Sequence, residues 1–275
     1  MKYRGAITFD IDGTLLSTNS QAKSCYLMAF KQTFEIEDID EPVFKGGIDL
    51  EILKNLCKTY KINLNNKLLE KFINNFLINL ENKTNINNWL IYNNVERFLS
   101  RLKDMGFLLY IVSGNFYKTG LFKLEKTNLC NYFDFLSLNE REFSRLELMK
   151  KAKDYAKENN LNIIAHFGDS YHDIMTSYFF NIPSFLFIPD IKYENYKDFC
   201  IDLNENLLLY DINQIFDNLN YFFYIDSLKT EKIYVEYSQN KNKENKNILL
   251  IFNSYKNLES NFENIIKLDI FNIGG

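Results

Sequence analysis

Two aspartates separated by one residue follow an apolar run near the start of the chain. The run is Ala6 to Phe9, and the aspartates are Asp10 and Asp12. In an extended segment, residues two apart point to the same side, so both carboxylates can face one small ligand. Carboxylates this close repel each other unless a cation lies between them or their roles differ. The pair therefore indicates a divalent-cation site, and oxygen donors alone favour Mg²⁺ over zinc.

The residues after this pair suit close approach to a bound group. Gly13 permits a sharp turn of the backbone, and Thr14 follows it. At Asp10-Ile11-Asp12-Gly13-Thr14 the chain resembles the haloacid dehalogenase-like hydrolases, most of which are magnesium-dependent phosphatases. The resemblance, closest to phosphoglycolate phosphatase-like members, implies that Asp10 is a nucleophile and Asp12 a general acid and base. It also implies that Gly13 and Thr14 lie against the phosphate, and that the backbone carbonyl of Asp12 binds the metal.

A second polar motif, Ser113-Gly114-Asn115, directly follows the apolar segment 107–112. A hydroxyl and freely oriented backbone N–H groups at a strand end can bind phosphate oxygens. Ser-Gly also occurs in ordinary turns, so the motif is weak by itself. We assign Ser113, Gly114 and Asn115 to phosphate binding as part of the site that the resemblance implies.

A third motif, Gly168-Asp169-Ser170-Tyr171-His172-Asp173, follows the apolar segment 162–167. Asp169 and Asp173 are four residues apart, so a helix that begins near Ser170 places them one turn from each other. Acids at a helix N-terminus are also common for dipole reasons. Their position at the end of another strand of the same sheet favours a metal site. With the resemblance, it implies a metal set of Asp10, Asp12, Asp169 and Asp173, in which Asp173 binds through water or holds another ligand in place.

The resemblance also implies a basic residue, usually lysine, at the start of a helix between these two motifs. Ser144 is a suitable N-cap, which puts Arg145 at that place. Arginine would neutralise phosphate and pair with Asp10 through a planar guanidinium group, whereas lysine would offer a compact ammonium group. Three competitors remain, and they are Arg141, Lys150 and Lys151.

Together these residues predict hydrolysis of a small phosphate monoester through an aspartyl-phosphate on Asp10. The family's dehalogenases lack the second acid, so Asp12 favours a phosphatase or a phosphomutase. One alternative is a sugar phosphomutase that uses the same residues, and another is a non-catalytic binding or assembly protein on the same fold. The histidines offer no competing chemistry: His166 lies in an apolar strand, where a core role is expected, and His172 flanks the acids.

The elements around these motifs predict an α/β fold with a doubly wound parallel sheet. From residue 90 onward apolar strands alternate with helices, which implies βαβ crossovers. Residues 17–89 carry amphipathic helical stripes instead, so we predict a helical cap domain inserted into a core domain of residues 1–16 and 90–222. Within the cap, Gly46, Gly47 and Asp49 either reach the site or simply join two helices.

The C-terminal extension, residues 223–275, fits the resemblance poorly and receives no function. Its two apolar segments, 232–238 and 248–255, predict a β-hairpin across the polar run Gln-Asn-Lys-Asn-Lys-Glu-Asn-Lys-Asn, placed on the sheet edge or on a second subunit. A short strand over 207–210 and a helix over 212–219 are expected to complete the core.

Composition limits the remaining possibilities. The net charge of −4 has no basic block, so no nucleic-acid partner is expected. The four cysteines form no metal-binding spacing and indicate a reducing compartment. No segment has the length or hydropathy of a membrane span or signal peptide, so we expect a cytoplasmic protein. Its expected partner is a small phosphorylated metabolite. The oligomeric state is left open, with a homodimer as one alternative.

Overall fold

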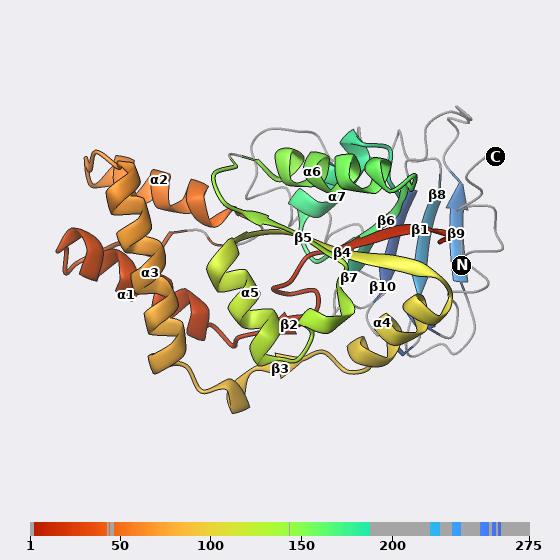
Figure 1. The fold of residues 1–275 in the computed structure, drawn as a ribbon, viewed down its shortest axis with the longest axis horizontal. Helices are drawn as coiled ribbons and strands as arrows, with labels where there is room; N and C mark the ends of the chain where they lie inside the picture. The colour runs from red at the N-terminus through yellow and green to blue at the C-terminus, as the bar shows by residue number, and fades with distance from the viewer. Residues whose placement is uncertain are drawn as a thin grey trace.

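A single mixed sheet forms the centre of the molecule. The computed structural model describes residues 3–42, 44, 47–142, 144–187, 221–225, 233–237, 248–252, 255–256 and 258–259. The strand order in the sheet is β5-β4-β1-β6-β7-β10-β8-β9, and all neighbours are parallel except β8 and β9 (Figure 1). The strands are β1 (Gly5–Phe9), β4 (Phe107–Phe116), β5 (Phe135–Asn139), β6 (Ile163–Gly168), β7 (Ser184–Phe187), β8 (Tyr221–Ile225), β9 (Ile233–Tyr237) and β10 (Ile248–Phe252).

The first strand lies in the interior of the sheet and is the point where the winding reverses. β4 and β5 lie on one side of β1, and β6 and β7 lie on the other. Phe9 at the end of β1 is paired with Ile111 of β4 and with Phe167 of β6. Residues that follow these three strands must therefore converge at one edge, where ligands of open α/β sheets bind. The predicted doubly wound α/β fold is confirmed.

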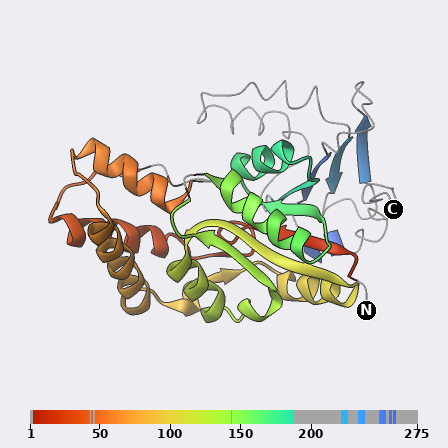
Figure 2. The same ribbon diagram turned by 45° about the horizontal axis from the view of Figure 1, so that its top comes forward.

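Helices cover both faces of this sheet (Figure 2). They are α4 (Val95–Asp104), α5 (Tyr117–Lys126), α6 (Arg145–Glu158) and α7 (Tyr171–Phe179), with a short 3₁₀ turn η2 (Cys130–Tyr132). Apolar residues of α4 pack with Ile7 and Phe9 in one core, and those of α6 pack with Ala6 and Tyr110 in another. Alternate residues of β1 thus serve opposite faces, as the strand period requires. Within the described residues, the helices are too short or too polar to cross a membrane.

The segment between residues 17 and 90 folds as three helices at the carboxyl end of the sheet, drawn in red and orange in Figures 1 and 2. They are α1 (Gln21–Phe34), α2 (Asp49–Thr59) and α3 (Asn66–Lys83), followed by the turn η1 (Ile86–Asn88). The chain enters and leaves this cap through a short antiparallel pair, β2 (Leu16–Ser17) with β3 (Leu90–Ile91). Tyr26 of α1 packs edge-on against Phe72 and Phe76 of α3, which fixes these two helices together.

The predicted C-terminal hairpin is wrong in its pairing. Both strands are present as β9 and β10, but β10 lies between β7 and β8 and runs parallel to both. Its sequence, Ile-Leu-Leu-Ile-Phe, is a continuous apolar run of the kind found in interior parallel strands, whereas β9 alternates and pairs antiparallel at the edge. The proposed boundary at residue 222 falls inside β8. The strand over 207–210 and the helix over 212–219 lie outside the described residues.

Candidate active site

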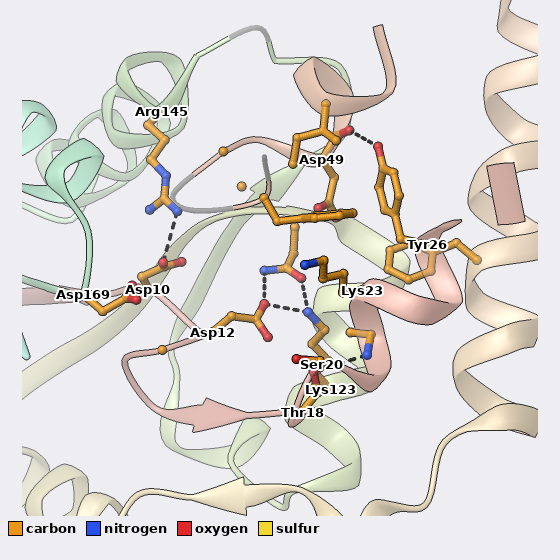
Figure 3. A pocket seen from close by; sticks show the side chains of 18 residues that line it. Asp10, Asp12, Thr18, Ser20, Lys23, Tyr26, Asp49, Lys123, Arg145 and Asp169 are labelled. Atoms are coloured by element: carbon orange, nitrogen blue, oxygen red, sulfur yellow. Dashed lines mark hydrogen bonds and ion pairs between the residues drawn. The ribbon is translucent and has the colours of Figure 1, made fainter. Parts of the chain in front are cut away.

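Three carboxylates from two strand ends come together at the edge defined by β1 and β6. Asp10 follows β1, Asp169 follows β6, and Asp173 lies in the first turn of α7. Each offers an oxygen atom within 4.8 Å of the others (Figure 3 labels Asp10 and Asp169). Asp10 is only 3% exposed, so the cluster is largely removed from water. Burial raises the pKa of Asp10, Arg145 opposes that shift, and Asp173 adds to it.

Arg145 supplies the positive charge next to this cluster. It is the first residue of α6, whose start is set by a capping box between Ser144 and Glu147. Its two terminal nitrogens bind different acids, with Nη2 donating to Asp10 Oδ2 at 3.1 Å and Nη1 donating to Asp173 Oδ1 at 2.5 Å. A planar guanidinium can join two carboxylates in this way and an ammonium cannot to the same degree.

The three alternative basic residues lie elsewhere. Arg141 borders a different hollow, next to Glu70 and Tyr117. Lys151 forms ion pairs with Glu140 and Glu142, and Lys150 is exposed on α6. Arg145 is therefore the one of the four that the structure brings to the acids.

Asp173 differs from its two neighbours because its oxygens are already occupied. Oδ1 accepts from Arg145 and lies 3.2 Å from His166 Nε2, while Oδ2 accepts from the backbone N–H and hydroxyl of Ser170. A carboxylate has about four acceptor positions, so these contacts use them all. Burial alone would raise the pKa of Asp173, but Arg145, His166 and Ser170 hold it well below its usual range. Asp173 thus acts as a carboxylate that orients Arg145.

The remaining free oxygens fit a metal ion. Asp10 Oδ1 is buried and has no hydrogen-bond partner among the described residues. Burial raises the pKa of Asp169 well above its usual value, and Asp173 and Asp10 add to this effect. A divalent cation between Asp10 and Asp169 would relieve that repulsion, and all-oxygen donors suit a hard cation. The chemistry of the donor set therefore fits a hard divalent metal bound mainly by these two acids.

Gly13 lets the loop after β1 pass directly over Asp169. Its φ is +81°, a left-handed conformation that favours glycine, and a Cβ atom there would overlap the Asp169 carboxylate. Thr14, the next residue, is fully buried, and its backbone carbonyl accepts a hydrogen bond of 2.7 Å from the hydroxyl of Tyr255. Of the residues predicted to bind phosphate, Gly13, Gly114 and Asn115 line the cavity, whereas Thr14 and Ser113 are buried behind its surface.

A second group of polar side chains surrounds Asp12. Asn115 donates from Nδ2 to Asp12 Oδ2 at 2.8 Å and to Ser113 Oγ at 2.9 Å. Lys123 Nζ donates to the same Asp12 Oδ2 at 2.6 Å and to Asn115 Oδ1 at 2.6 Å (Figure 3). The side chain of Asn115 therefore orients Asp12 and Ser113. Because this side chain is occupied, the group of Asn115 that could bind a phosphate is its backbone N–H.

Sequence reasoning missed Lys123. The residue lies between Phe122 and Leu124 on α5, where an amphipathic helix places apolar side chains, and it is only 3% exposed. A lysine at such a position requires a buried partner, since an unpaired buried charge is costly. That anomaly within the apolar stripe was the available signal, but the sequence contains no indication of which acid is the partner.

The cap completes a cavity of about 280 Å³ above these groups. Its lining from the cap is partly apolar and partly polar, and comprises Thr18, Ser20, Ala22, Lys23, Tyr26, Phe44, Gly47, Asp49, Ile52 and Phe76. The cap touches the core tightly here, because a Cβ atom on Gly114 would lie 2.8 Å from the carbonyl oxygen of Gly47. The loop before α2 was expected either to reach the site or simply to join two helices, and the structure favours the first alternative. Gly46 lies outside the described residues.

Asp49 is a cap residue that binds the core directly next to the site. Its Oδ2 accepts from the backbone N–H of Phe116 at 2.9 Å, and its carbonyl accepts from the hydroxyl of Tyr26 at 2.7 Å. Burial raises the pKa of Asp49 to about 6, an effect that the nearby Lys123 and the Phe116 N–H partly offset. Asp49 therefore faces the cavity with a carboxyl that titrates closer to neutrality than an ordinary aspartate.

The two histidines stand outside the cavity. His166 is buried, as expected, and its partners are Asp173 and the hydroxyl of Thr8, at 2.9 Å from Nδ1. His172 lies on α7, and burial lowers its pKa. Neither residue lines the space between cap and core.

Comparisons with known proteins place the chain in a family. The family model described as haloacid dehalogenase-like hydrolase matches residues 7–187, which is more than half of the chain. The chain belongs to this family of hydrolases. No curated protein matches the chain.

Solved structures show the same fold at low sequence identity. A predicted phosphatase from Clostridium acetobutylicum is similar with a TM-score of 0.53 and 20% identity, covering 76% of this chain and 100% of that one. The β-phosphoglucomutase of Clostridium difficile has a TM-score of 0.53 and 18% identity, covering 74% and 99%. A predicted phosphoglycolate phosphatase from Haemophilus somnus has a TM-score of 0.50 and 22% identity, covering 66% and 84%. These likenesses support the fold and leave the substrate open.

Proposed function

We propose that the protein is a magnesium-dependent phosphatase that hydrolyses a small phosphate monoester through an aspartyl-phosphate on Asp10. The observation that carries this proposal is the state of Asp10, which is buried, bound through one oxygen to Arg145 and unpartnered at the other. A carboxylate held in that way next to a cation, with a second acid two residues away, is arranged for nucleophilic attack on a phosphoryl group. Similar solved structures described as phosphatases agree with it.

In the first half-reaction, a carboxylate oxygen of Asp10 bonds to phosphorus while the ester P–O bond breaks. Asp12, which faces the cavity, gives a proton to the departing alcohol oxygen. Arg145 neutralises charge on the phosphoryl oxygens, and backbone N–H groups after Ser113 bind them. A Mg²⁺ held by Asp10, Asp169 and the backbone carbonyl of Asp12 would supply further charge neutralisation.

In the second half-reaction, water attacks the phosphorus and the bond to Asp10 breaks. Asp12 takes the proton from that water, which restores the starting protonation of the site. The cavity of about 280 Å³ must hold both the phosphoryl group and the alcohol, so the substrate is a small metabolite. Its partly apolar lining from the cap would contact the alcohol portion.

The test is hydrolysis of p-nitrophenyl phosphate and a panel of phosphorylated metabolites, with and without EDTA. We expect magnesium-dependent phosphate release by the wild type and a loss of at least about 10³-fold in Asp10→Asn, since the nucleophile is removed. The matched control is Asp104→Asn, an exposed aspartate at the end of α4, which should keep full activity. Isomerised sugar phosphate without free phosphate would indicate a mutase, and absence of any turnover would disprove the proposal.

A further inference from the structure

Lys123 has no role in the mechanism described so far, yet it is one of the most buried charged residues in the described part of the chain. Its side chain is 4% exposed, and that of its partner Asp12 is 40% exposed. The ion pair therefore has a buried end on α5 and an open end at the cavity. Burying an ammonium group is costly unless it is paired. The presence of Lys123 at this position is therefore best explained by the role of its partner, Asp12.

The contacts around Asp12 are asymmetric. Both protein donors, Lys123 Nζ at 2.6 Å and Asn115 Nδ2 at 2.8 Å, bind the same oxygen, Oδ2. Lys123 also binds Asn115 Oδ1 at 2.6 Å, so the three side chains form a closed triangle. This triangle fixes the rotation of the Asp12 carboxyl. The other oxygen, Oδ1, receives no hydrogen bond from the described residues and belongs to a residue that lines the cavity.

The two buried cations of the site, Arg145 and Lys123, form ion pairs with different acids. Arg145 lies with Asp10 and Asp173 on the side of the nucleophile, and Lys123 lies with Asp12 and Asp49 on the side of the cap. Each group has its own buried cation. Since Arg145 already serves the nucleophile, Lys123 is available to the residue that handles protons.

We propose that Lys123 is the positioning residue of the acid and base, holding Asp12 by Oδ2 so that Oδ1 faces the oxygen atom that leaves the phosphorus. This inference rests on the proposed phosphatase function. In the first half-reaction a proton on Asp12 passes to the leaving oxygen as the P–O bond breaks, and in the second a proton of water returns to Asp12. Lys123 keeps its own protons throughout and acts only through the orientation of Asp12.

The leaving group distinguishes this role from others. An alkoxide is a strong base and needs a proton as it departs, whereas p-nitrophenolate is a weak base and does not. Loss of a positioned Asp12 should therefore slow attack on an alkyl phosphate and spare the first turnover of an aryl phosphate. A cation that bound the phosphoryl group directly would affect both esters equally.

The experiment compares Lys123→Met with the wild type in the full-length protein. We expect kcat for glycerol 2-phosphate to fall about 10- to 100-fold with KM changed less than about threefold, because a misplaced catalytic group costs about that much. The rate of p-nitrophenolate release in the first turnover should stay within about threefold. The control is Lys126→Met, one turn away on the same helix, where the lysine is exposed and should be replaceable without effect.

The outcomes separate the two proposals. If Lys123→Met keeps the wild-type kcat for glycerol 2-phosphate, or loses the same factor in that kcat and in the first-turnover release of p-nitrophenolate, the assignment of Lys123 is overturned and the phosphatase stands. If the wild type hydrolyses neither these two esters nor any member of the metabolite panel, the proposed function fails and this inference with it. Thermal unfolding checks the fold, and if Lys123→Met does not fold, Lys123→Gln, which keeps an N–H donor, is measured instead and should show a smaller loss in the same direction.

Discussion

Single residues in this site work through paired charges. Arg145 and Lys123 each bind an acid that would do chemistry and a second polar group that fixes the geometry. Such hydrogen-bonded networks hold side chains in one arrangement before a ligand arrives, which is what catalytic groups require. Asp49 is different, since its carboxyl is bound at Oδ2 by a backbone N–H and has a pKa raised to about 6.

The raised pKa of Asp49 predicts a pH-dependent effect of Asp49→Asn on stability. Below about pH 4 the carboxyl is protonated in both folded and unfolded states, so the folded state has no penalty. Between about pH 4 and 6 the unfolded state ionises first, and above about pH 6 the folded protein carries the full cost of the buried charge. Asp49→Asn should therefore exceed the wild type by about 1 to 2 kcal/mol in unfolding free energy at pH 8 and by much less at pH 4.

Urea unfolding at the two pH values measures this difference. Asp38→Asn, which removes an exposed carboxyl of the same cap, is the control and should show no such gap. If Asp49→Asn differed from the wild type in unfolding free energy by the same amount at both pH values, the raised pKa of Asp49 would be contradicted.

At the scale of elements, the loop after β1 is supported from behind by the C-terminal segment, residues 248–259 as far as they are described. Phe252, Tyr255 and Leu258 join the core that contains α4, and Glu259 binds Arg97 at 3.0 Å and Arg101 at 3.3 Å on that helix. This segment lies beyond the part of the chain that the family model matches. It is nevertheless built into the sheet and the core.

Tyr255→Phe tests that support. The change keeps the aromatic packing but removes the hydroxyl, leaving the buried carbonyl of Thr14 without this donor. We expect the free energy of unfolding to fall by about 1 to 3 kcal/mol, the usual cost of an unsatisfied buried polar group. Tyr3→Phe, at a tyrosine that is 52% exposed, should change it by less than about 0.5 kcal/mol. Equal stability of Tyr255→Phe and wild type in denaturant unfolding would show that the contact is unimportant.

For the whole molecule, the crowded acids predict coupling between metal binding and stability. A cation that binds the folded state and not the unfolded state stabilises the protein by about 2.7 kcal/mol at a concentration 100 times its Kd. We expect millimolar Mg²⁺ to raise Tm and EDTA to lower it, even without substrate.

Asp169→Asn identifies the site of that effect. The variant should lose most of the magnesium-dependent shift in Tm, because Asp169 is one of the two acids expected to hold the ion, whereas Asp104→Asn should keep it. A shift of the same size in Asp169→Asn, measured by differential scanning calorimetry, would mean that the ion binds elsewhere.

The sequence alone determined the strand ends and the acids that follow them. An apolar run that stops at Asp10 or before Asp169 is a local pattern, and parallel strands bring their carboxyl ends to one edge whatever the rest of the chain does. The start of α6 was equally local, since Ser144 and Glu147 form a capping box within four residues and thereby set the position of Arg145.

Only the tertiary structure decided the partners that are distant in sequence. Lys123 meets Asp12 across 111 residues, and the Tyr255 hydroxyl meets the Thr14 carbonyl across 241. The position of β10 between β7 and β8 is of the same kind, and it replaced the expected hairpin. Periodicity shows which face of an element is buried, but the partner on that face depends on how whole elements pack, which no short stretch of sequence contains.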